Sequence, residues 1–428
     1  MPRDYSASLT QLERAERSIP LGSQTFSKSR TALPKGAAPL YLTHGQGGHV
    51  WDVDGNEYVD LVCGLAAVLL GYRDEGVDRA VQAQMQQGVS FSLPHPIEAE
   101  VAEALIQVVP CAEQVRFGKN GSDATSGAIR LARAHTGRDH ILMCGYHGWQ
   151  DWSIGTTTRN AGVPKAVRAL TTTFAYGDLE AVERGLRANP VAAIILEPMN
   201  LTDPPAGFLE GLQTLAREHG ALLVFDETIT GFRFAVGGAQ ELFGVTPDLA
   251  TFGKGLGNGL PISVVCGRAD VMAGMEEIFF SSTFGGETLA LAAAREVLQR
   301  LRTEPILETL ATRGRRLAEG LTDRITRFGA GHLMSVSGHP TWSFVNLKAP
   351  EGTPLWDLRT LFLQEMLERG VLTLGTHNLC AAHDDADAAQ ILAAYDEVVP
   401  ILVDAVAHGD IAKRLRCDPL VPLFQVRG

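Results

Sequence analysis

The segments AAIILEP (192–198), GFLEGLQTLAREHG (207–220) and ALLVFDE (221–227) decide the predicted fold of this chain. The first and third are short apolar runs that end in acids, as strands buried in a parallel sheet do. Between them, leucines recur at helical spacing and Gly220 ends the helix. A strand, a helix and a second strand in this order predict a βαβ unit, whose right-handed crossover brings both strand ends to one edge of the sheet.

Chemically useful side chains follow the ends of these strands. Glu197 and Asp226 close the two strands, and the run DLATFGK (248–254) predicts another short strand with Lys254 directly after it. Ligands of open α/β sheets bind outside the carboxyl ends of the strands. We therefore expect both acids and the amine to converge on one cleft. The run PISVVCGR (261–268) predicts the next strand, and an antiparallel direction is open to it.

The glycines around Lys254 admit two interpretations. Gly253, Gly255, Gly257 and Gly259 flank this single amine within the stretch ATFGKGLGNGLPISV. On its own, the stretch is typical of a flexible surface turn with a solvated lysine, because most lysines are exposed. Glycine also permits close approach of backbones, so the same pattern fits a packed return between two strands that holds the amine in the cleft. The strand pattern around the stretch favours the packed return.

An anion site is predicted upstream, in RFGKNGSDATSGAIRLARAHTG (116–137). A strand ends there, and an amphipathic helix opens after Gly121 and Ser122, where free N–H groups and the helix dipole attract anions such as phosphate. The alternative is an ordinary helix start capped by Ser122 or Asp123. The pattern is neither GxxxxGK[ST] nor GxGxxG, which disfavours nucleoside triphosphates and dinucleotides.

The next predicted strand, HILMCG (140–145), delivers Tyr146, His147 and Trp149 to the same edge. An aromatic ring there can stack on a flat cofactor, although an isolated aromatic is more often part of a core. Four features now occur in order at strand ends: a phosphate cradle, an aromatic ring, a buried acid and a lysine among glycines. This combination suits pyridoxal 5′-phosphate (PLP).

Composition limits the remaining classes. The chain has 428 residues, 45% of them hydrophobic, and a formal net charge of −12, which fits a large core and disfavours binding to nucleic acid or an anionic membrane. No apolar run is long enough to span a membrane and no export signal is evident, so we expect a cytoplasmic protein. The six cysteines are scattered without CxxC spacing, which predicts reduced, mostly buried thiols and no metal site.

Three runs, LVFDETITGFRF, PDLATFGKGLGNGLPISVV and SSTFGGETLAL, together resemble the class III aminotransferases of the fold type I PLP-dependent enzymes. The resemblance is nearest to the glutamate-1-semialdehyde aminotransferase-like branch and covers nearly the whole chain. It implies an α/β fold. A large PLP-binding domain over residues 72–315 would hold a mainly parallel seven-stranded sheet. A smaller α/β domain would combine residues 1–71 and 316–428.

The resemblance also implies roles for individual residues. Lys254 matches the lysine that forms a Schiff base with the cofactor and then moves protons. Asp226 matches the acid that pairs with the pyridine nitrogen, and Glu197 matches, less closely, an acid near the ring and its 3-oxygen; for Glu197, a carboxylate satisfied by local backbone is the alternative. The other positions implied to bind cofactor are Gly121 and Ser122 at the phosphate, Tyr146 on a ring face, Thr228 behind the ring, and Thr283, which would reach the phosphate of the second subunit of a homodimer.

Departures from the family pattern bear on the substrate. Thr228 replaces an apolar residue, which can be neutral or add a hydrogen bond. Semialdehyde aminomutases carry an arginine shortly after the early glycine turn, whereas this chain reads LGSQTFSKSR, with Gln24, Phe26 and Lys28; Lys28 or Arg30 could replace it. Loss of a bidentate guanidinium is not conservative. Family analogy adds a hydroxyl-rich keto or aldehyde acceptor as an option.

We therefore predict an aminotransferase that uses a small amine donor and a keto or aldehyde acceptor in two half-reactions. A PLP-dependent isomerase, either an aminomutase or an amino-acid racemase, is the first alternative. A non-catalytic protein on the same fold is the second, and the presence of both Lys254 and Asp226 disfavours it. The residues expected to face the substrate are His147, Trp149, Trp152 and Glu287.

Overall fold

A computed structural model describes residues 3–422 of the chain, which divide into two compact units. One unit, called the sheet unit below, contains Ala66–Leu69 and Glu75–Leu307. The other, called the terminal unit, contains residues 3–65, the short piece Leu70–Asp74 and residues 308–422. The chain therefore returns to the terminal unit after building the sheet unit.

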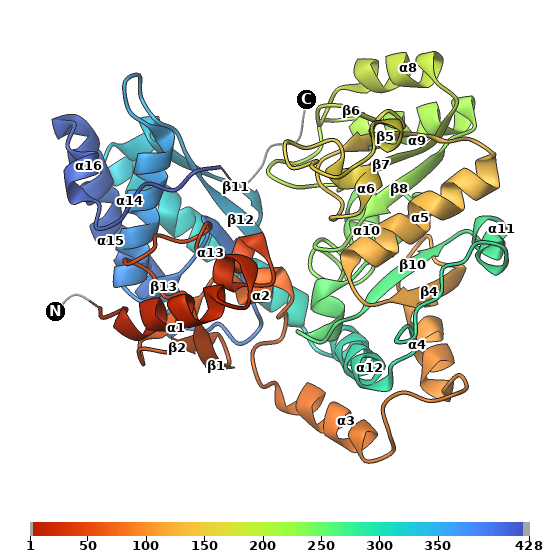
Figure 1. Cartoon of the computed structure of the whole chain (residues 1–428), viewed down its shortest axis with the longest axis horizontal. Helices are drawn as coiled ribbons and strands as arrows, with labels where there is room; N and C mark the ends of the chain where they lie inside the picture. The colour runs from red at the N-terminus through yellow and green to blue at the C-terminus, as the bar shows by residue number, and fades with distance from the viewer. Residues whose placement is uncertain (1–2, 423–428) are drawn as a thin grey trace. The chain divides into compact units, whose positions relative to one another are not determined.

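The sheet unit is organised around seven strands (Figure 1). Strand β10 pairs antiparallel with both of its neighbours, and the other pairings are parallel. This confirms the predicted mainly parallel seven-stranded sheet and the antiparallel option for residues 261–268. In spatial order the strands are β4 (Gln114–Gly118), β10 (Ser263–Gly267), β9 (Leu249–Phe252), β8 (Leu222–Asp226), β7 (Val191–Leu196), β5 (His140–Cys144) and β6 (Thr171–Thr173).

Helices cover both faces of this sheet because successive strand residues point to opposite sides. Ile195 and Val224 pack in a core with the alanine-rich face of α5, whereas Ile194 and Leu223 pack with the leucines of α9. The buried strands are apolar on both faces for this reason. The helical segments are α3 (Glu75–Met85), α4 (Pro96–Ile106), α5 (Gly121–Thr136), α6 (Asp151–Ile154), α7 (Lys165–Arg168), α8 (Leu179–Ala188), α9 (Phe208–His219), α10 (Ala239–Phe243), η3 (Lys254–Gly257), α11 (Ala269–Met272), η4 (Ala273–Glu276) and α12 (Thr288–Thr303).

The terminal unit joins both ends of the chain in one sheet. Strand β13 (Val371–Leu372) pairs parallel with β3 (Glu57–Asp60), which continues antiparallel to β2 (His49–Asp52) and β1 (Leu42–Gln46). A second, antiparallel sheet has the order β11 (Met334–His339), β12 (Trp342–Leu347) and β14 (Thr376–Asn378). The helical segments are α1 (Ser6–Glu16), η1 (Pro20–Gly22), η2 (Phe26–Lys28), α13 (Ile306–Arg327), η5 (Ala330–His332), α14 (Leu355–Glu368), α15 (Asp385–His408) and α16 (Ile411–Arg414).

A left-handed turn, α2 (Cys63–Ala66), lies where the chain first passes from the terminal unit to the sheet unit. Its four residues all have positive φ, between 46° and 65°, and only Gly64 is a glycine. Left-handed backbone costs roughly 1–2 kcal/mol for each residue with a Cβ. Contacts around the turn must therefore hold it in place.

Two expectations on composition can be compared with the structure. The six cysteines form no disulfide, and all except Cys417 are buried, which confirms the prediction of reduced, mostly buried thiols. No helix within residues 3–422 is long and apolar enough to cross a membrane.

Candidate active site

The carboxyl ends of three adjacent strands bring together the two acids and the amine singled out in the sequence. Glu197, Asp226 and Lys254 follow or close β7, β8 and β9, which are neighbours in the sheet. Both carboxylates act electrostatically on the Lys254 ammonium, so the three groups share one site. The structure thus produces the convergence that the strand pattern indicates.

Lys254 is held by a tightly packed turn rather than by a mobile surface loop. It has φ 45° and opens η3, and the next residues, Gly255, Leu256 and Gly257, are buried. Gly259 has φ 100°, a conformation that a residue with a Cβ rarely adopts. The Asn258 side chain closes the turn by accepting a hydrogen bond from the Leu69 N–H at 2.9 Å. The glycines therefore serve the packed return between β9 and β10.

The surroundings of Lys254 favour its neutral amine. Burial lowers the pKa of Lys254, the carboxylates of Glu197 and Asp226 oppose this, and the cation of Arg233 lowers it further. The net effect is a pKa below the ordinary value of lysine. Arg233 is only 1% exposed and donates to the Ala66 carbonyl oxygen at 3.3 Å. A neutral amine can act as a nucleophile or as a base.

Asp226 is a buried carboxylate that several protein groups contact. His147 contacts it through Nδ1 at 2.7 Å, and Thr228 donates to it from its hydroxyl at 2.5 Å and its N–H at 3.1 Å. The Thr251 hydroxyl adds a bond of 3.2 Å. Burial alone would raise the pKa of Asp226, but the bonds from His147 and Thr228 outweigh burial and lower it. The site therefore keeps Asp226 ionised.

His147 supports Asp226 from behind, which differs from the substrate contact expected from the sequence. It is 2% exposed, and its second ring nitrogen, Nε2, bonds to the Cys144 carbonyl oxygen at 2.9 Å. Burial lowers the pKa of His147, yet Asp226 more than offsets burial and raises it above the ordinary value. With both ring nitrogens bonded to protein groups, His147 has neither left for a substrate.

Glu197 differs from Asp226 in its protonation. Burial, followed by repulsion from Asp226, raises the pKa of Glu197 to about 7, although His147, Lys254 and Asn200 oppose the rise. The Asn200 amide donates to its carboxyl group at 2.5 Å. Two carboxyl groups at one edge thus have separated pKa values, an arrangement that is common in catalytic sites.

The turn before α5 has the shape of an anion cradle. The N-terminus of a helix leaves its first N–H groups without helical partners, and Gly121 and Ser122 are the first residues of α5. The cap is Asn120 rather than the expected Ser122 or Asp123, although Asp123 closes the capping box by accepting from the Asn120 N–H at 3.0 Å. Ser122 Oγ accepts from the Trp149 N–H at 3.2 Å, and a Cβ on Gly148 would lie 2.3 Å from that oxygen.

The remaining predicted residues occupy different environments. Tyr146 and Trp149 are 41% and 64% exposed at the same edge, as a stacking or substrate contact requires. Trp152 instead lies in the core and donates to Ser126 Oγ at 2.9 Å. Glu287 caps α12 and pairs with Lys119 at 2.9 Å, so both of its oxygens already have protein partners. These placements differ from the expected substrate contacts of Trp152 and Glu287.

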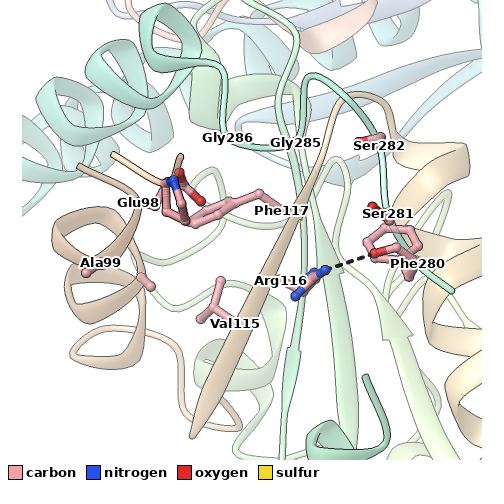
Figure 2. A pocket seen from close by; sticks show the side chains of 12 residues that line it. Glu98, Ala99, Val115, Arg116, Phe117, Phe280, Ser281, Ser282, Gly285 and Gly286 are labelled. Carbon is pink, nitrogen blue, oxygen red and sulfur yellow. Dashed lines mark hydrogen bonds between the residues drawn. The ribbon is translucent and has the colours of Figure 1, made fainter. Parts of the chain in front are cut away.

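Thr283 is exposed on the loop before α12. Its chain neighbours Ser281, Ser282 and Gly285 help to line a hollow of about 450 Å³ (Figure 2). Residues of α4, β4 and the loop line this hollow, and Arg116 donates across it to the Phe280 carbonyl oxygen at 3.2 Å. Neither Lys254 nor Asp226 lines it. The hollow is therefore separate from the site at the strand ends.

Three features of the site were not predicted from the sequence: the buried cation of Arg233, the His147 contact to Asp226, and the hydroxyl of Thr251 behind the same carboxylate. Arg233 left one signal, since an arginine between Phe232 and Phe234 is unusual in an apolar run. The contact between His147 and Asp226 left none, because it joins residues far apart in the chain.

Comparisons with known proteins agree with this geometry. The family described as aminotransferase class-III matches residues 32–383. A 3-aminobutyryl-CoA aminotransferase from Cloacimonas acidaminovorans is 34% identical over 91% of this chain and 96% of its own. A glutamate-1-semialdehyde 2,1-aminomutase from Syntrophobacter fumaroxidans is 38% identical over 87% and 90%. The FumI protein of Sphingopyxis sp. MTA144, solved in its PLP internal aldimine form, is 30% identical, covers 96% of this chain and 98% of its own, and has a TM-score of 0.88.

Proposed function

This chain belongs to the class III aminotransferase family, and we propose that it moves an amino group from a small amine donor to a keto or aldehyde acceptor with PLP as its cofactor. The observation that carries the proposal is the shared site of Lys254, Asp226 and Glu197 at the ends of adjacent strands. An amine with a lowered pKa beside an ionised acid suits transfer of protons at carbon.

The residues at the sheet edge fit PLP. Free helix N–H groups at Gly121 and Ser122 would bind its phosphate, Tyr146 would stack on its ring, and Asp226 would pair with its pyridine nitrogen. A Cβ on Gly121 would approach the Thr228 methyl group to 3.1 Å, so the glycine keeps the cradle open. When bound, PLP supplies a protonated pyridine ring that draws electrons from the reacting carbon.

Lys254 has two tasks. Its Nζ would hold the cofactor, and as a free amine it would take a proton from one carbon and return it to another. The second task needs the neutral amine, which the lowered pKa of Lys254 provides. Arg233 supports it by adding a positive charge nearby.

Asp226 keeps its charge for the pyridine nitrogen. His147, Thr228 and Thr251 hold the carboxylate in one orientation. The Thr228 hydroxyl donates to Asp226, so Thr228 would affect the cofactor only through this carboxylate. The protonated form of Glu197 at neutral pH offers an O–H donor near the ring and its 3-oxygen.

The proposed substrate is a small molecule. Near its early glycine turn, this chain lacks the arginine that the aminomutases carry there. Of the two candidates to replace that arginine, Arg30 is paired with Glu16 at 2.5 Å. Lys28 ends the short turn η2, where Phe26 is 44% exposed. The segment thus presents an aromatic ring and an amine, which favours the aminotransferase over the aminomutase.

The active form is proposed to be a homodimer. Phe279 and Phe284 are 84% and 56% exposed on the loop that carries Thr283. Large apolar side chains that one loop exposes to solvent suit an interaction surface. A second copy that covers this loop would bring Thr283 to the cofactor phosphate of its partner.

Titration of the purified holoenzyme with L-glutamate, L-alanine and other amines, without acceptor, tests the proposal. We expect the visible band of the cofactor to disappear while oxo acid is released in an amount equal to the cofactor. A band that persists without oxo acid, while the α-hydrogen of the donor exchanges with solvent, would instead identify an isomerase. Absence of any spectral change or exchange with every amine would favour a non-catalytic protein.

A further inference from the structure

We propose that the terminal unit contains a binding site for a thiophilic cation of the zinc class, formed by Cys63, Cys380 and His383. One ligand atom from each residue lies within 4.8 Å of the other two, and all three residues are buried. Thiolate sulfur and imidazole nitrogen are the preferred ligands of Zn²⁺ in proteins. The site is separate from the strand ends that hold Lys254, and it does not depend on the proposed function.

The distance between the Cys380 sulfur and the His383 nitrogen fits a zinc centre. With Zn–S of about 2.3 Å and Zn–N of about 2.0–2.1 Å, tetrahedral geometry separates sulfur from nitrogen by about 3.5 Å. Cys380 Sγ and His383 Nδ1 lie 3.5 Å apart. Cys63 Sγ is 3.1 Å from the Asp60 carbonyl oxygen, which fixes the third ligand beside them.

The ligand nitrogen of His383 is Nδ1, which is unprotonated in the neutral ring. The Cys380 N–H donates to Nδ1 at 3.1 Å, so Nδ1 carries no proton in the neutral ring. A cation would take over this lone pair from the amide. The other nitrogen, Nε2, is buried and finds no hydrogen-bond partner among the described residues.

The backbone around the cluster is built to hold it. A Cβ on Gly48 would lie 2.4 Å from the His383 ring, so glycine is needed for the ring to take this position. Asn378, two residues before Cys380, donates from its side chain to the Val62 carbonyl oxygen at 2.9 Å, and its own amide oxygen is buried without a partner. The two chain segments that carry the thiols are thereby tied together.

Cys63 also begins the left-handed turn Cys63–Ala66. A cation bound there would fasten the strained turn to the segment from Cys380 to His383. The next residues of the chain reach the lysine turn, since the Leu69 N–H bonds to Asn258. We therefore expect the cation to stabilise the holoenzyme against unfolding.

The test is metal binding by the reduced holoenzyme. We expect one Zn²⁺ per chain in competition with a chromophoric chelator, and a cadmium–thiolate charge-transfer band with Cd²⁺. Cys63→Ser, Cys380→Ser and His383→Gln should each weaken zinc binding at least tenfold, the lower end of the effect of losing even an outer-shell partner (~10–100-fold). Cys111→Ser and Cys417→Ser remove a buried and a surface thiol and should bind zinc like the wild type.

A measurement on the wild type avoids variants that fail to fold. Bound Zn²⁺ should protect Cys63 and Cys380, but not Cys417, from alkylation during mild denaturation, as mapped by mass spectrometry. Equal alkylation with and without zinc, or unchanged binding in the three ligand variants, would overturn the proposal. Metal-free protein exposed to air can form a disulfide between Cys63 and Cys380. If this protein binds no zinc after the disulfide has been reduced, the proposal is also overturned.

Discussion

Asp226 and Glu227 are adjacent, both buried, and differ in almost everything that decides their roles. Asp226 faces the strand ends with Lys254 and is kept ionised by His147. Glu227 points the other way and accepts from the N–H groups of Ala239 and Gln240 at the start of α10, at 2.6 and 3.0 Å, and from Thr230 at 2.7 Å. Burial raises the pKa of Glu227. The hydrogen-bond partners of a buried carboxylate, more than its burial, therefore distinguish a catalytic role from a structural one.

The largest expected effect is at Lys254, on which Asp226 acts and Glu227 does not. Lys254→Ala should lower the rate of oxo-acid formation by on the order of 10⁴-fold or more, because general base catalysis alone contributes 10²–10⁴. Steady-state turnover measures this, with circular dichroism and the melting temperature as controls of folding. Turnover within tenfold of the wild type would show that Lys254 is not a catalytic residue.

Asp226→Asn should come next. Loss of one partner from a buried pair costs about 3–5 kcal/mol, and the site loses the charge that holds the pyridine nitrogen protonated, so we expect turnover to fall about 10²–10³-fold. Affinity for PLP, measured by reconstitution of the apoenzyme, should fall as well. If both quantities stay within threefold of the wild type, the distinction between the two acids fails.

Glu227→Gln is the matched test on the neighbouring acid. The glutamine side chain would place its NH₂ group against the N–H groups at the start of α10. This lowers the free energy of unfolding by about 1–3 kcal/mol. For a domain of this size each kcal/mol lowers the melting temperature by about 2–4 °C. We expect a lower melting temperature with nearly unchanged turnover at 25 °C. A selective loss of turnover at unchanged stability would assign Glu227 to the chemistry.

The smallest effect concerns the pH dependence of Glu197. Its pKa is raised from 4.5 to about 7 in the fold, so its contribution to stability is present at low pH and is lost as pH rises through about 7. Because the side chain is partly accessible, we expect at most about 3 kcal/mol, from 1.36 kcal/mol per pKa unit.

Glu197→Gln removes this titration. The melting temperature of the apoenzyme variant should therefore rise relative to wild type between pH 5 and pH 8. Parallel melting profiles of the two proteins over this range would show that Glu197 titrates at its ordinary pKa.

The sequence predicted the features that follow from local pattern. Apolar runs that end in acids predicted the strands. Because parallel strands end at the same edge of a sheet, they also predicted that Glu197, Asp226 and Lys254 converge. The antiparallel option for residues 261–268 could also be predicted, and so could the helix near residue 121, although its cap, Asn120, was missed. The implied domain boundaries at residues 71 and 315, like the roles of individual site residues, stay predictions.

Features that depend on tertiary contacts could not be predicted from the sequence. His147 and Trp152 follow the same strand end as Tyr146, and only the packing of α6 against the sheet turns them inward. The spacing of the cysteines gave no sign of a metal site, because Cys63 and Cys380 approach one another only after β3 and β13 pair. Spacing in the chain detects local ligand motifs and misses ligands brought together by the two ends of a chain.

The central claim is that Lys254 is the amine that binds the cofactor. Reduction of the holoenzyme with borohydride, followed by proteolysis and mass spectrometry, tests it most directly. We expect a pyridoxyl group on the peptide that contains Lys254 and on no other. A pyridoxyl group on Lys119, the other lysine at this edge, or no modified peptide at all, would contradict it.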